Sequence, residues 1–338
     1  MRLPGKGVRI LAILALACVC AVLALVITWH LVSSPYKGFS SAEVFVYIPK
    51  GTSVPQIGRL LGEAGVIAHP RLFGWYVRLL YPTSSLKAGE YRFDRASSIQ
   101  AVADKLLKGQ VYVVKVTVPE GFSRTEVVDL LVRSGIGNTD ALLKATQDTA
   151  AIAQLDRQAP DLEGYLFPET YFFSRRVPEK EVVRTMVSGF LRIWTPERQQ
   201  KARELNMTVR EVLTLASLVE KETALPTERQ LVSAVFHNRL LKNIPLASDP
   251  TIIYGVKQIK DYDGVINKSD LRLDSPYNTY LYSGLPPGPI ASPGLAAIDA
   301  ALDPAKVDFL FFVSRNDGSH LFTVDYRDHM RGVQQYQR

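Results

Sequence analysis

The feature that most constrains this chain is an unbroken run of apolar residues near its N-terminus. Residues 10–27 read ILAILALACVCAVLALVI, and Thr28 and Trp29 follow. With a rise of ~1.5 Å per residue, a helix of this length spans about 27 Å, close to the hydrocarbon thickness of a bilayer. The run therefore predicts a single transmembrane helix over residues 10–32, preceded by a tail of residues 1–9.

The charges around this run predict its orientation. Arg2, Lys6 and Arg9 precede it, whereas basic residues are sparse on the far side. The positive-inside rule then places residues 1–9 in the cytoplasm and residues 34–338 outside the plasma (inner) membrane. A cleaved signal peptide is the alternative, but it has a shorter apolar region and a small-x-small exit, which residues 28–33 lack.

Composition narrows the partners and cofactors. The formal net charge of +7 fits an anionic partner: nucleic acid, acidic lipid or a carboxylate-rich wall polymer. No dense basic helix or RNA-binding aromatic signature occurs, so no nucleic-acid partner is expected. Cys18 and Cys20 are the only cysteines and both lie in the apolar run, which excludes a disulfide scaffold, a Cys-ligated zinc site or a cysteine nucleophile beyond it. The five histidines lack metal-ligand spacing, so we expect no metal and no other cofactor.

A sequence pattern that occurs twice, the internal echo, follows a polar linker at residues 33–41. Residues 48–66 and 118–136 have the same order of features, and each predicts a strand ending at Pro-x-Gly, a Ser N-cap and an amphipathic helix. Between the two copies, residues 86–93 predict a strand and residues 98–108 a helix. Residues 42–115 resemble a LysM-type glycan-binding module, although small α+β units that bind no sugar share this pattern.

The remaining residues, 116–338, predict a second domain of mixed helices and strands, which carries the candidate catalytic residues. Residues 140–205 are largely helical in pattern, with an interruption at residues 161–176, and shorter helices and strands follow. Helices and strands alternate unevenly, and no GxGxxG or GxxxxGK[ST] motif occurs, which argues against a nucleotide-binding parallel sheet. The predicted class is α+β, with one transmembrane helix and a LysM-like unit before the catalytic domain.

Residues 208–223 predict a helix that carries two candidate acids. Thr208 and Glu211 form a capping box that defines its start. Glu220 and Glu222 are two positions apart, hence ~200° around the helix, so they cannot share one cleft. Glu220 follows the small Ala216 and Ser217 by about one turn, whereas Glu222 is better placed for exposure or a structural pairing. A carboxylate that borders an apolar face has a raised pKa, as a general acid requires, although a Glu in such a position is more often simply solvated.

Six longer motifs carry a resemblance to a known family. They are Leu162–Tyr171 (LEGYLFPETY), Ala216–Thr223 (ASLVEKET), Val235–Leu240 (VFHNRL), Ser248–Gly255 (SDPTIIYG), Ser275–Tyr280 (SPYNTY) and Gly284–Gly294 (GLPPGPIASPG). In this order they resemble the endolytic murein transglycosylases of the YceG-like family, from the anchor to the C-terminus. His237 is a mild departure from the family pattern. The resemblance implies that Glu220, the first glutamate of ASxxEKE, is catalytic.

The resemblance also implies a reaction and its setting. A lytic transglycosylase lets the C6 hydroxyl of muramic acid attack C1, so one Glu can serve as acid and base, without the second carboxylate of a hydrolase. The expected partner is the peptidoglycan glycan strand, with synthases and division or elongation proteins as candidate neighbours and strand termination as the expected role. Two alternatives stay open: a hydrolytic muramidase using Asp249 or Glu163, and a non-catalytic wall-binding scaffold.

Other motif residues are candidates for substrate binding, and each has a structural alternative. Tyrosines and amides can stack on or hydrogen-bond sugars, but they also pack cores, and Asp before Pro is a common turn former. The candidates are Glu163, Tyr171, Ser217, Asn238, Asp249, Tyr254, Tyr277, Asn278 and Tyr280. The Pro/Gly-rich residues 284–294 could wall the groove, and His320 is expected to be structural.

Overall fold

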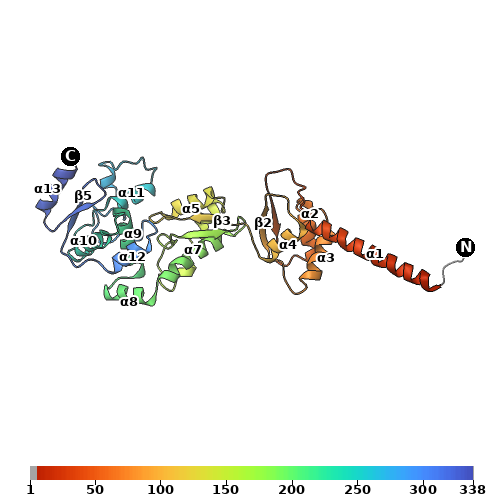
Figure 1. The fold of residues 1–338 in the computed structure, drawn as a ribbon. Helices are drawn as coiled ribbons and strands as arrows, with labels where there is room; N and C mark the ends of the chain where they lie inside the picture. The colour runs from red at the N-terminus through yellow and green to blue at the C-terminus, as the bar shows by residue number, and fades with distance from the viewer. Residues whose placement is uncertain (1–5, 338) are drawn as a thin grey trace. The chain divides into compact units, whose positions relative to one another are not determined.

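The computed structural model describes residues 6–337, which divide between Val113 and Val114 into an N-terminal unit and a C-terminal unit (Figure 1). Helices dominate both units, and the strands pair into three separate two-stranded antiparallel sheets. The predicted α+β class is confirmed. The assignment of residues 42–115 as a LysM-like module stays a prediction.

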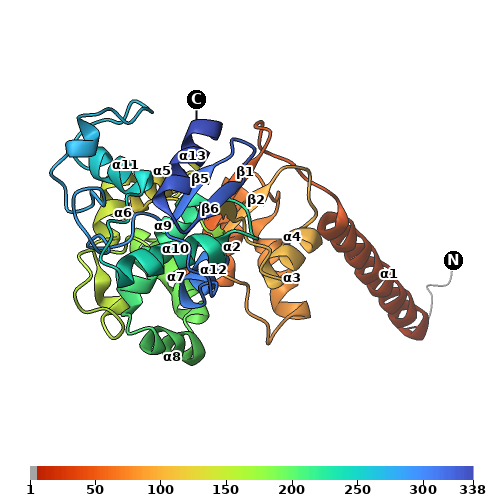
Figure 2. The same ribbon diagram turned by 90° about the vertical axis from the view of Figure 1, so that its left-hand side faces the viewer.

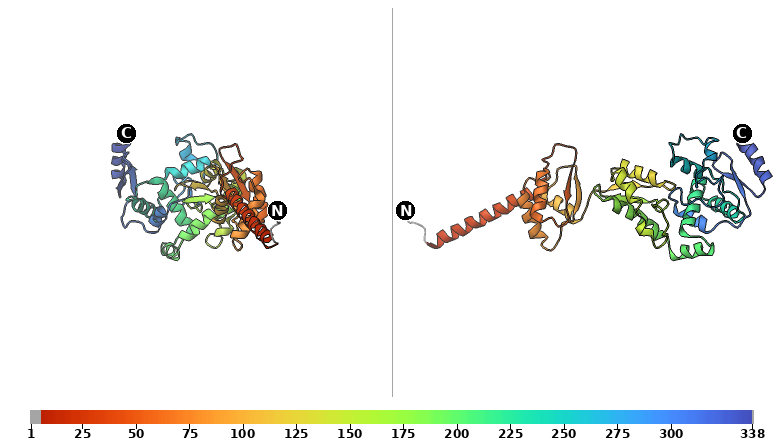
Figure 3. Two further views of the ribbon diagram at one scale, coloured as in Figure 1. Left: turned by 45° about the vertical axis from the view of Figure 1, so that its right-hand side comes forward. Right: turned by 180° about the vertical axis from the view of Figure 1, so that it is seen from behind.

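The apolar run forms one continuous helix, α1 (Lys6–Ser33), which Figures 2 and 3 show without a break. Residues Ile10–Ser33 are long and apolar enough to cross a membrane, and their apolar side chains are exposed up to Leu31. Val32, by contrast, is 3% exposed and belongs to the core of the N-terminal unit. The helix therefore enters that unit directly at its C-terminal end.

The N-terminal unit packs three helices against a two-stranded sheet. Strands β1 (Val44–Ile48) and β2 (Gly89–Phe93) pair in antiparallel register, Val44 with Phe93 and Ile48 with Gly89. Ile48, Phe73 and Tyr91 are among the fully buried side chains that join sheet and helices. The helices are α2 (Val54–Glu63), α3 (Pro70–Leu80) and α4 (Ile99–Leu107).

The C-terminal unit begins with strand β3 (Val114–Thr117), which pairs with β4 (Thr170–Phe173). Strands β5 (Phe311–Ser314) and β6 (His320–Thr323) form a hairpin near the C-terminus. The helices of this unit are α5 (Arg124–Arg133), α6 (Thr139–Ala145), α7 (Glu179–Ile193), α8 (Pro196–Glu204), α9 (Val209–Glu222), α10 (Arg229–Leu241), α11 (Asp249–Lys257), α12 (Leu295–Leu302) and α13 (Tyr326–Tyr336), with short 3₁₀ turns at Thr149–Ile152 and Asp270–Arg272.

The two copies of the internal echo have the predicted local structure. Ser53 and Ser123 are the N-caps of α2 and α5, and each helix begins with a capping box. The preceding turns need glycine, because Gly51 and Gly121 have φ of +81° and +75°. The prediction of two equivalent strand–turn–helix segments is therefore confirmed.

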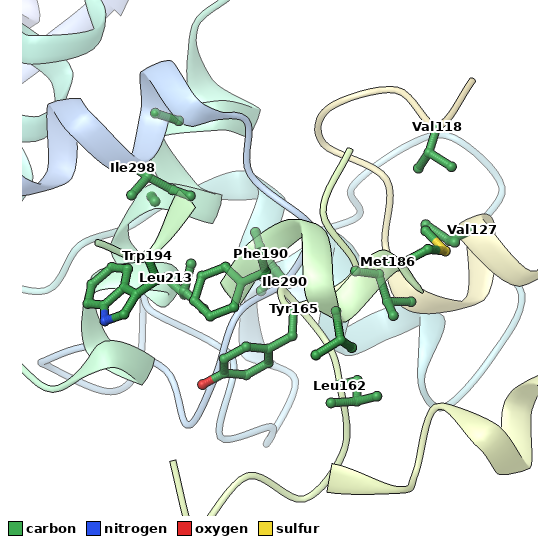
Figure 4. Close-up of a cluster of buried hydrophobic side chains, with 14 of the residues drawn as sticks. Val118, Val127, Leu162, Tyr165, Met186, Phe190, Trp194, Leu213, Ile290 and Ile298 are labelled. Atoms are coloured by element: carbon green, nitrogen blue, oxygen red, sulfur yellow. The ribbon is translucent and has the colours of Figure 1, made fainter. Parts of the chain in front are cut away.

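Helix α9 lies at the centre of the C-terminal core. Its start is the predicted capping box: Glu211 N–H donates to Thr208 Oγ1, and Thr208 N–H donates to the Glu211 carboxylate at 2.7 Å. All but one of the residues from Val212 to Val219 are apolar or small, and all are buried, packed against α10 and α12. Figure 4 shows part of this core, in which Phe190 lies between Tyr165 and Trp194 with ring centroids 5.2 and 5.9 Å away. Burying each such large side chain stabilises the fold by about 1.5–3 kcal/mol, so the position of α9 is firmly set.

Candidate active site

Glu220 lies in the last turn of α9, where the helix emerges from the core. The residue is half-buried, and its Oε2 accepts a hydrogen bond of 2.9 Å from the backbone N–H of Gly294. Gly294 is the N-cap of α12, at the end of the Pro/Gly-rich stretch that begins at Gly284. The structure therefore brings the last residue of this stretch against the predicted catalytic carboxylate.

A second segment, the turn at Glu120 and Gly121, borders the same carboxylate. Lys221 Nζ donates to Gly121 O at 3.2 Å, and Gly121 N–H donates to Ser292 O at 2.9 Å. A methyl group added to Gly294 would overlap the Glu120 carboxylate. Glu120 and Glu220 therefore approach the same glycine.

This environment raises the pKa of Glu220 above the usual range of a glutamate. Partial burial is the main cause, and the negative charge of Glu120 adds to it. The hydrogen bond from Gly294 and the charges of Arg229 and Lys221 act in the opposite direction. A carboxyl group that keeps its proton at a higher pH is suited to act as a general acid.

A cavity of about 540 Å³, with both polar and apolar lining, adjoins this site, because Gly121 and Lys221 form part of its wall. Its volume lies within the range typical of ligand sites. Tyr254 and Tyr277 also line it, with ring centroids 4.8 Å apart. The remaining lining includes Arg124, Glu126, Asp161, Glu163 and Lys257. This mixture of aromatic and charged groups is suited to a sugar polymer that bears carboxylates and amides.

A second cavity of about 540 Å³ is lined by Arg229, whose charge acts on Glu220, and by Ala296 of α12. Arg198, Lys201 and Asp299 also line it, and Arg198 forms an ion pair with Asp299 at 2.8 Å. Space for a ligand thus exists beside Lys221 and beside Arg229.

Glu163 is a buried carboxylate in the wall of the first cavity. Oε1 accepts from the backbone N–H of Arg124 at 2.8 Å, and Oε2 accepts from the Tyr254 hydroxyl at 3.1 Å. Burial raises the pKa of Glu163 to about 7 despite these two hydrogen bonds. Both oxygens are therefore already engaged in holding α5 and Tyr254 in place.

The raised pKa of Glu163 predicts a pH-dependent stability. Because the folded state holds this proton more tightly than the unfolded state, the contribution is complete below about pH 4.5 and is lost as the pH rises through about 7. We expect Glu163→Gln to remove on the order of 2–3 kcal/mol of the difference in unfolding free energy between pH 4.5 and pH 8. Urea unfolding at a series of pH values measures this difference. The prediction would be contradicted if the unfolding free energy of the variant changed with pH as steeply as that of the wild type.

Several other predicted residues lie in the core instead of in a cavity wall. Tyr171 is 6% exposed and donates to Phe167 O at 2.6 Å. Asn278 is 1% exposed and donates to Leu271 O and Leu273 O. These two side chains therefore stabilise nearby backbone. This is the structural role that the sequence left open as the alternative to substrate binding.

Ser217 and Asn238 also bind backbone. Ser217 is fully buried, and its hydroxyl accepts from Ile290 N–H at 3.1 Å, which ties α9 to the Pro/Gly-rich stretch. Asn238 donates to Val307 O and Phe309 O. Ser217 therefore supports the segment that reaches Glu220, whereas Asn238 holds the segment that leads from α12 to β5.

Asp249, Glu222 and Glu228 are each paired with a neighbouring side chain. Tyr280 OH donates to Asp249 Oδ1 at 2.7 Å. Glu222 accepts from the hydroxyl of Ser248, which confirms its predicted structural pairing, and burial raises its pKa to about 7. His320 Nδ1 lies 2.6 Å from Glu228 Oε2.

Among residues 6–337, no group of three or more His, Cys, Asp and Glu side chains could hold a metal ion.

The sequence of this chain matches the model of the YceG-like family over residues 46–335. The chain belongs to the YceG-like family. An endolytic murein transglycosylase of Bacillus subtilis is 32% identical over 318 residues, which cover 89% of this chain and 87% of that protein. An endolytic murein transglycosylase of Streptococcus pneumoniae is 30% identical over 332 residues, 89% of this chain but only 60% of the longer relative. A crystal structure of a YceG-like protein from Listeria monocytogenes has a TM-score of 0.58 at 30% identity and covers 86% of this chain and 99% of that one.

Two residues beside Glu220 were not predicted from the sequence of this YceG-like chain. Glu120 appeared there only as the middle residue of a Pro-x-Gly turn, and Gly294 only as the end of a loop. One signal was present: the first copy of the echo has Lys50 where the second has Glu120. A reversal of charge between otherwise similar turns indicates that the second turn has a different neighbour.

Proposed function

We propose that this chain is a membrane-anchored endolytic lytic transglycosylase. It cleaves the MurNAc–GlcNAc bond of peptidoglycan glycan strands, leaves 1,6-anhydroMurNAc ends and uses Glu220 as its single acid and base. The observation that carries this proposal is the half-buried Glu220 carboxylate, which a backbone N–H holds at one oxygen. Relatives that are named endolytic murein transglycosylases support the same reaction class.

The geometry of Glu220 suits a cycle in which one carboxyl group does two jobs. Protonated Glu220 donates its proton to the glycosidic oxygen as the bond to C1 of MurNAc breaks. The C6 hydroxyl of the same sugar attacks C1, and the Glu220 carboxylate accepts the hydroxyl proton, so the acid is regenerated and no water is consumed. Because nucleophile and electrophile belong to one ring, their proximity supplies much of the rate.

The hydrogen bond from Gly294 gives the two oxygens of Glu220 different roles. Oε2 is held by the N–H group, so Oε1 is the oxygen that exchanges the proton with the sugar. The N–H group also stabilises the carboxylate form that exists between the two proton transfers. Both effects depend on the Pro/Gly-rich stretch that ends at Gly294.

A hydrolytic muramidase is the second candidate, and it requires another carboxylate that activates water or attacks the sugar. Both oxygens of Glu163 accept hydrogen bonds from the protein, and Asp249 accepts one from Tyr280. These contacts favour structural roles for Glu163 and Asp249, the two residues that the sequence offered as a second carboxylate.

Mass spectrometry of digested glycan strands distinguishes the two reactions. We expect the new muramic ends to be lighter by one water than reducing ends, because the C6 hydroxyl closes the ring. Incubation in ¹⁸O-labelled water provides the control, since an anhydro end takes up no label during cleavage. Labelled reducing ends as the main product would contradict the proposed reaction.

The apolar helix α1 supports the proposed location of the enzyme. The apolar span Ile10–Ser33 and the basic residues before it support a topology with the N-terminus in the cytoplasm and residues 34–338 outside the inner membrane. There the enzyme meets strands as they leave the membrane-bound synthases, which fits a role in ending strand elongation beside synthesis and division or elongation proteins.

A further inference from the structure

Helix α3 of the N-terminal unit has one buried face and one exposed face. Phe73 and Val77 are buried in the core of the unit. The exposed stripe at spacing i, i+4, i+7 and i+8 consists of Arg71, Trp75, Arg78 and Leu79. Trp75 is 74% exposed and Leu79 78%. A large aromatic and a large aliphatic side chain left exposed between arginines form an interaction surface.

A cavity of about 400 Å³ lies between this stripe and α2. Its lining has three charged residues, Arg59, Arg71 and Arg78, together with Trp75, Gly74, Pro55 and Pro70. Within residues 6–337, no acidic side chain lines this cavity, and none of the three arginines forms an ion pair. Three guanidinium groups around one space, without a carboxylate, are complementary to an anion such as a phosphate.

The close packing of α2 on α3 holds this three-arginine cavity together. A methyl group added to Gly58 would lie 2.7 Å from Pro70 O, and one added to Gly62 would lie 2.5 Å from Pro70 Cγ. Only glycine therefore permits the two helices to approach so closely. This approach brings Arg59 of α2 to the same cavity as Arg71 and Arg78 of α3.

The three-arginine cavity adjoins the end of the apolar helix α1. Arg71 also lines a neighbouring pocket to which Leu31 of α1 contributes, and α1 contacts α3 (Figures 1 and 2). Leu31 and the buried Val32 are among the last residues of the span Ile10–Ser33. Arg71 is thus found where a membrane crossed by α1 would have its headgroup layer, and it shares its cavity with Arg59, Arg78 and Trp75.

We propose that the three-arginine cavity binds the phosphate groups of anionic phospholipids, while Trp75 and Leu79 enter the membrane interface. This inference rests on the proposed role of α1 as an anchor. Tryptophan favours the headgroup level, and each arginine near an anionic surface gains from its negative potential. The N-terminal unit then docks on the bilayer through α3, in addition to its attachment through α1.

Bromolipid quenching of tryptophan fluorescence tests this docking on the full chain in vesicles. A Trp29→Phe variant reports on Trp75, and a Trp75→Phe variant reports on Trp29 within the span; Trp194 is buried in the C-terminal unit and is common to both. We expect Trp75 to be quenched by lipids brominated near the headgroup, and more strongly with phosphatidylglycerol than with phosphatidylcholine alone. Replacing Arg59, Arg71 and Arg78 by Gln should lower the ratio of membrane-docked to undocked N-terminal units on the order of a hundredfold.

The matched control replaces Lys50, Lys87 and Lys108 of the same unit by Gln, which removes equal charge outside the cavity and should preserve the quenching of Trp75. Quenching of Trp29 without quenching of Trp75 would overturn the docking inference and leave the anchor in place. Equal loss in both triple variants, or release of Trp75 by inorganic phosphate, would also overturn it. An unquenched Trp29 would overturn the anchor itself, and the docking inference with it.

Discussion

Glu220→Gln is expected to lower the rate of glycan cleavage on the order of 10²–10⁴-fold, while the chain still folds. Glutamine is almost the same size and can still accept the hydrogen bond from Gly294 through its carbonyl oxygen. It cannot donate a proton to the leaving oxygen or accept one from the C6 hydroxyl. The loss should therefore appear in kcat, with little change in the binding of strands.

Release of anhydro-muropeptides from isolated strands measures this effect, and unfolding curves check that stability is retained. Glu204→Gln is the matched control, because Glu204 is an exposed glutamate of the same unit and contacts Gln200. Full complementation of a deletion strain by Glu220→Gln would instead favour the non-catalytic scaffold.

The neighbouring carboxylate offers a finer test of the same role. Because the charge of Glu120 raises the pKa of Glu220, Glu120→Gln should lower that pKa. A general acid is active only while protonated, so the high-pH limb of the rate profile should move to lower pH, and the maximal rate should be largely retained. An unshifted limb would show that Glu220 is not the group that titrates.

Gly164→Ala is expected to destabilise the C-terminal unit by about 2–4 kcal/mol. Gly164 has a φ of +81°, a conformation that costs a residue with a Cβ about 1–2 kcal/mol. A methyl group there would also lie 2.6 Å from both Cβ and Cγ of Pro289, whose ring cannot turn aside. Relief of this overlap requires a shift of the Pro/Gly-rich stretch, and with it of Gly294.

Gly135→Ala separates the cost of the positive φ from the cost of the overlap with Pro289. Gly135 has nearly the same φ, +79°, but no heavy atom lies within 4 Å of an added Cβ. Its loss should be about 1–2 kcal/mol, from the backbone alone. Urea unfolding followed through Trp194, with Trp29 and Trp75 replaced by Phe, measures both variants. Equal losses of unfolding free energy in the two variants would show that Pro289 shifts away from the added methyl group without an energetic cost.

Local features of the fold could be predicted because neighbouring residues determine them. The capping box of Thr208 and Glu211 predicts where α9 begins, and the Ser N-caps predict α2 and α5. Helical spacing also separated Glu220 from Glu222, and of the two roles left open for Glu222, exposure or a structural pairing, the structure shows a pairing, with Ser248. Each of these inferences depends on residues a few positions apart in the chain.

The surroundings of Glu220 could not be predicted in the same way. Its hydrogen bond joins residues 74 positions apart, and its contact with the Glu120 turn joins residues still further apart in the chain. A Glu at the edge of an apolar helix face has the same local sequence whether it meets water or a backbone N–H. The raised pKa of Glu163 likewise depends on burial by α5 and α11, which no pattern around residue 163 reveals.

The position of Glu220 in the last turn of α9 has an electrostatic consequence. The aligned peptide dipoles of a helix place partial negative charge at its C-terminal end, an effect of about 0.3–1 kcal/mol within the last turn. The dipole of the 14-residue helix α9 points its negative end toward the last turn, where the Glu220 carboxylate lies. The backbone of α9 therefore favours the protonated form, and it would do so even if every charged neighbour were removed.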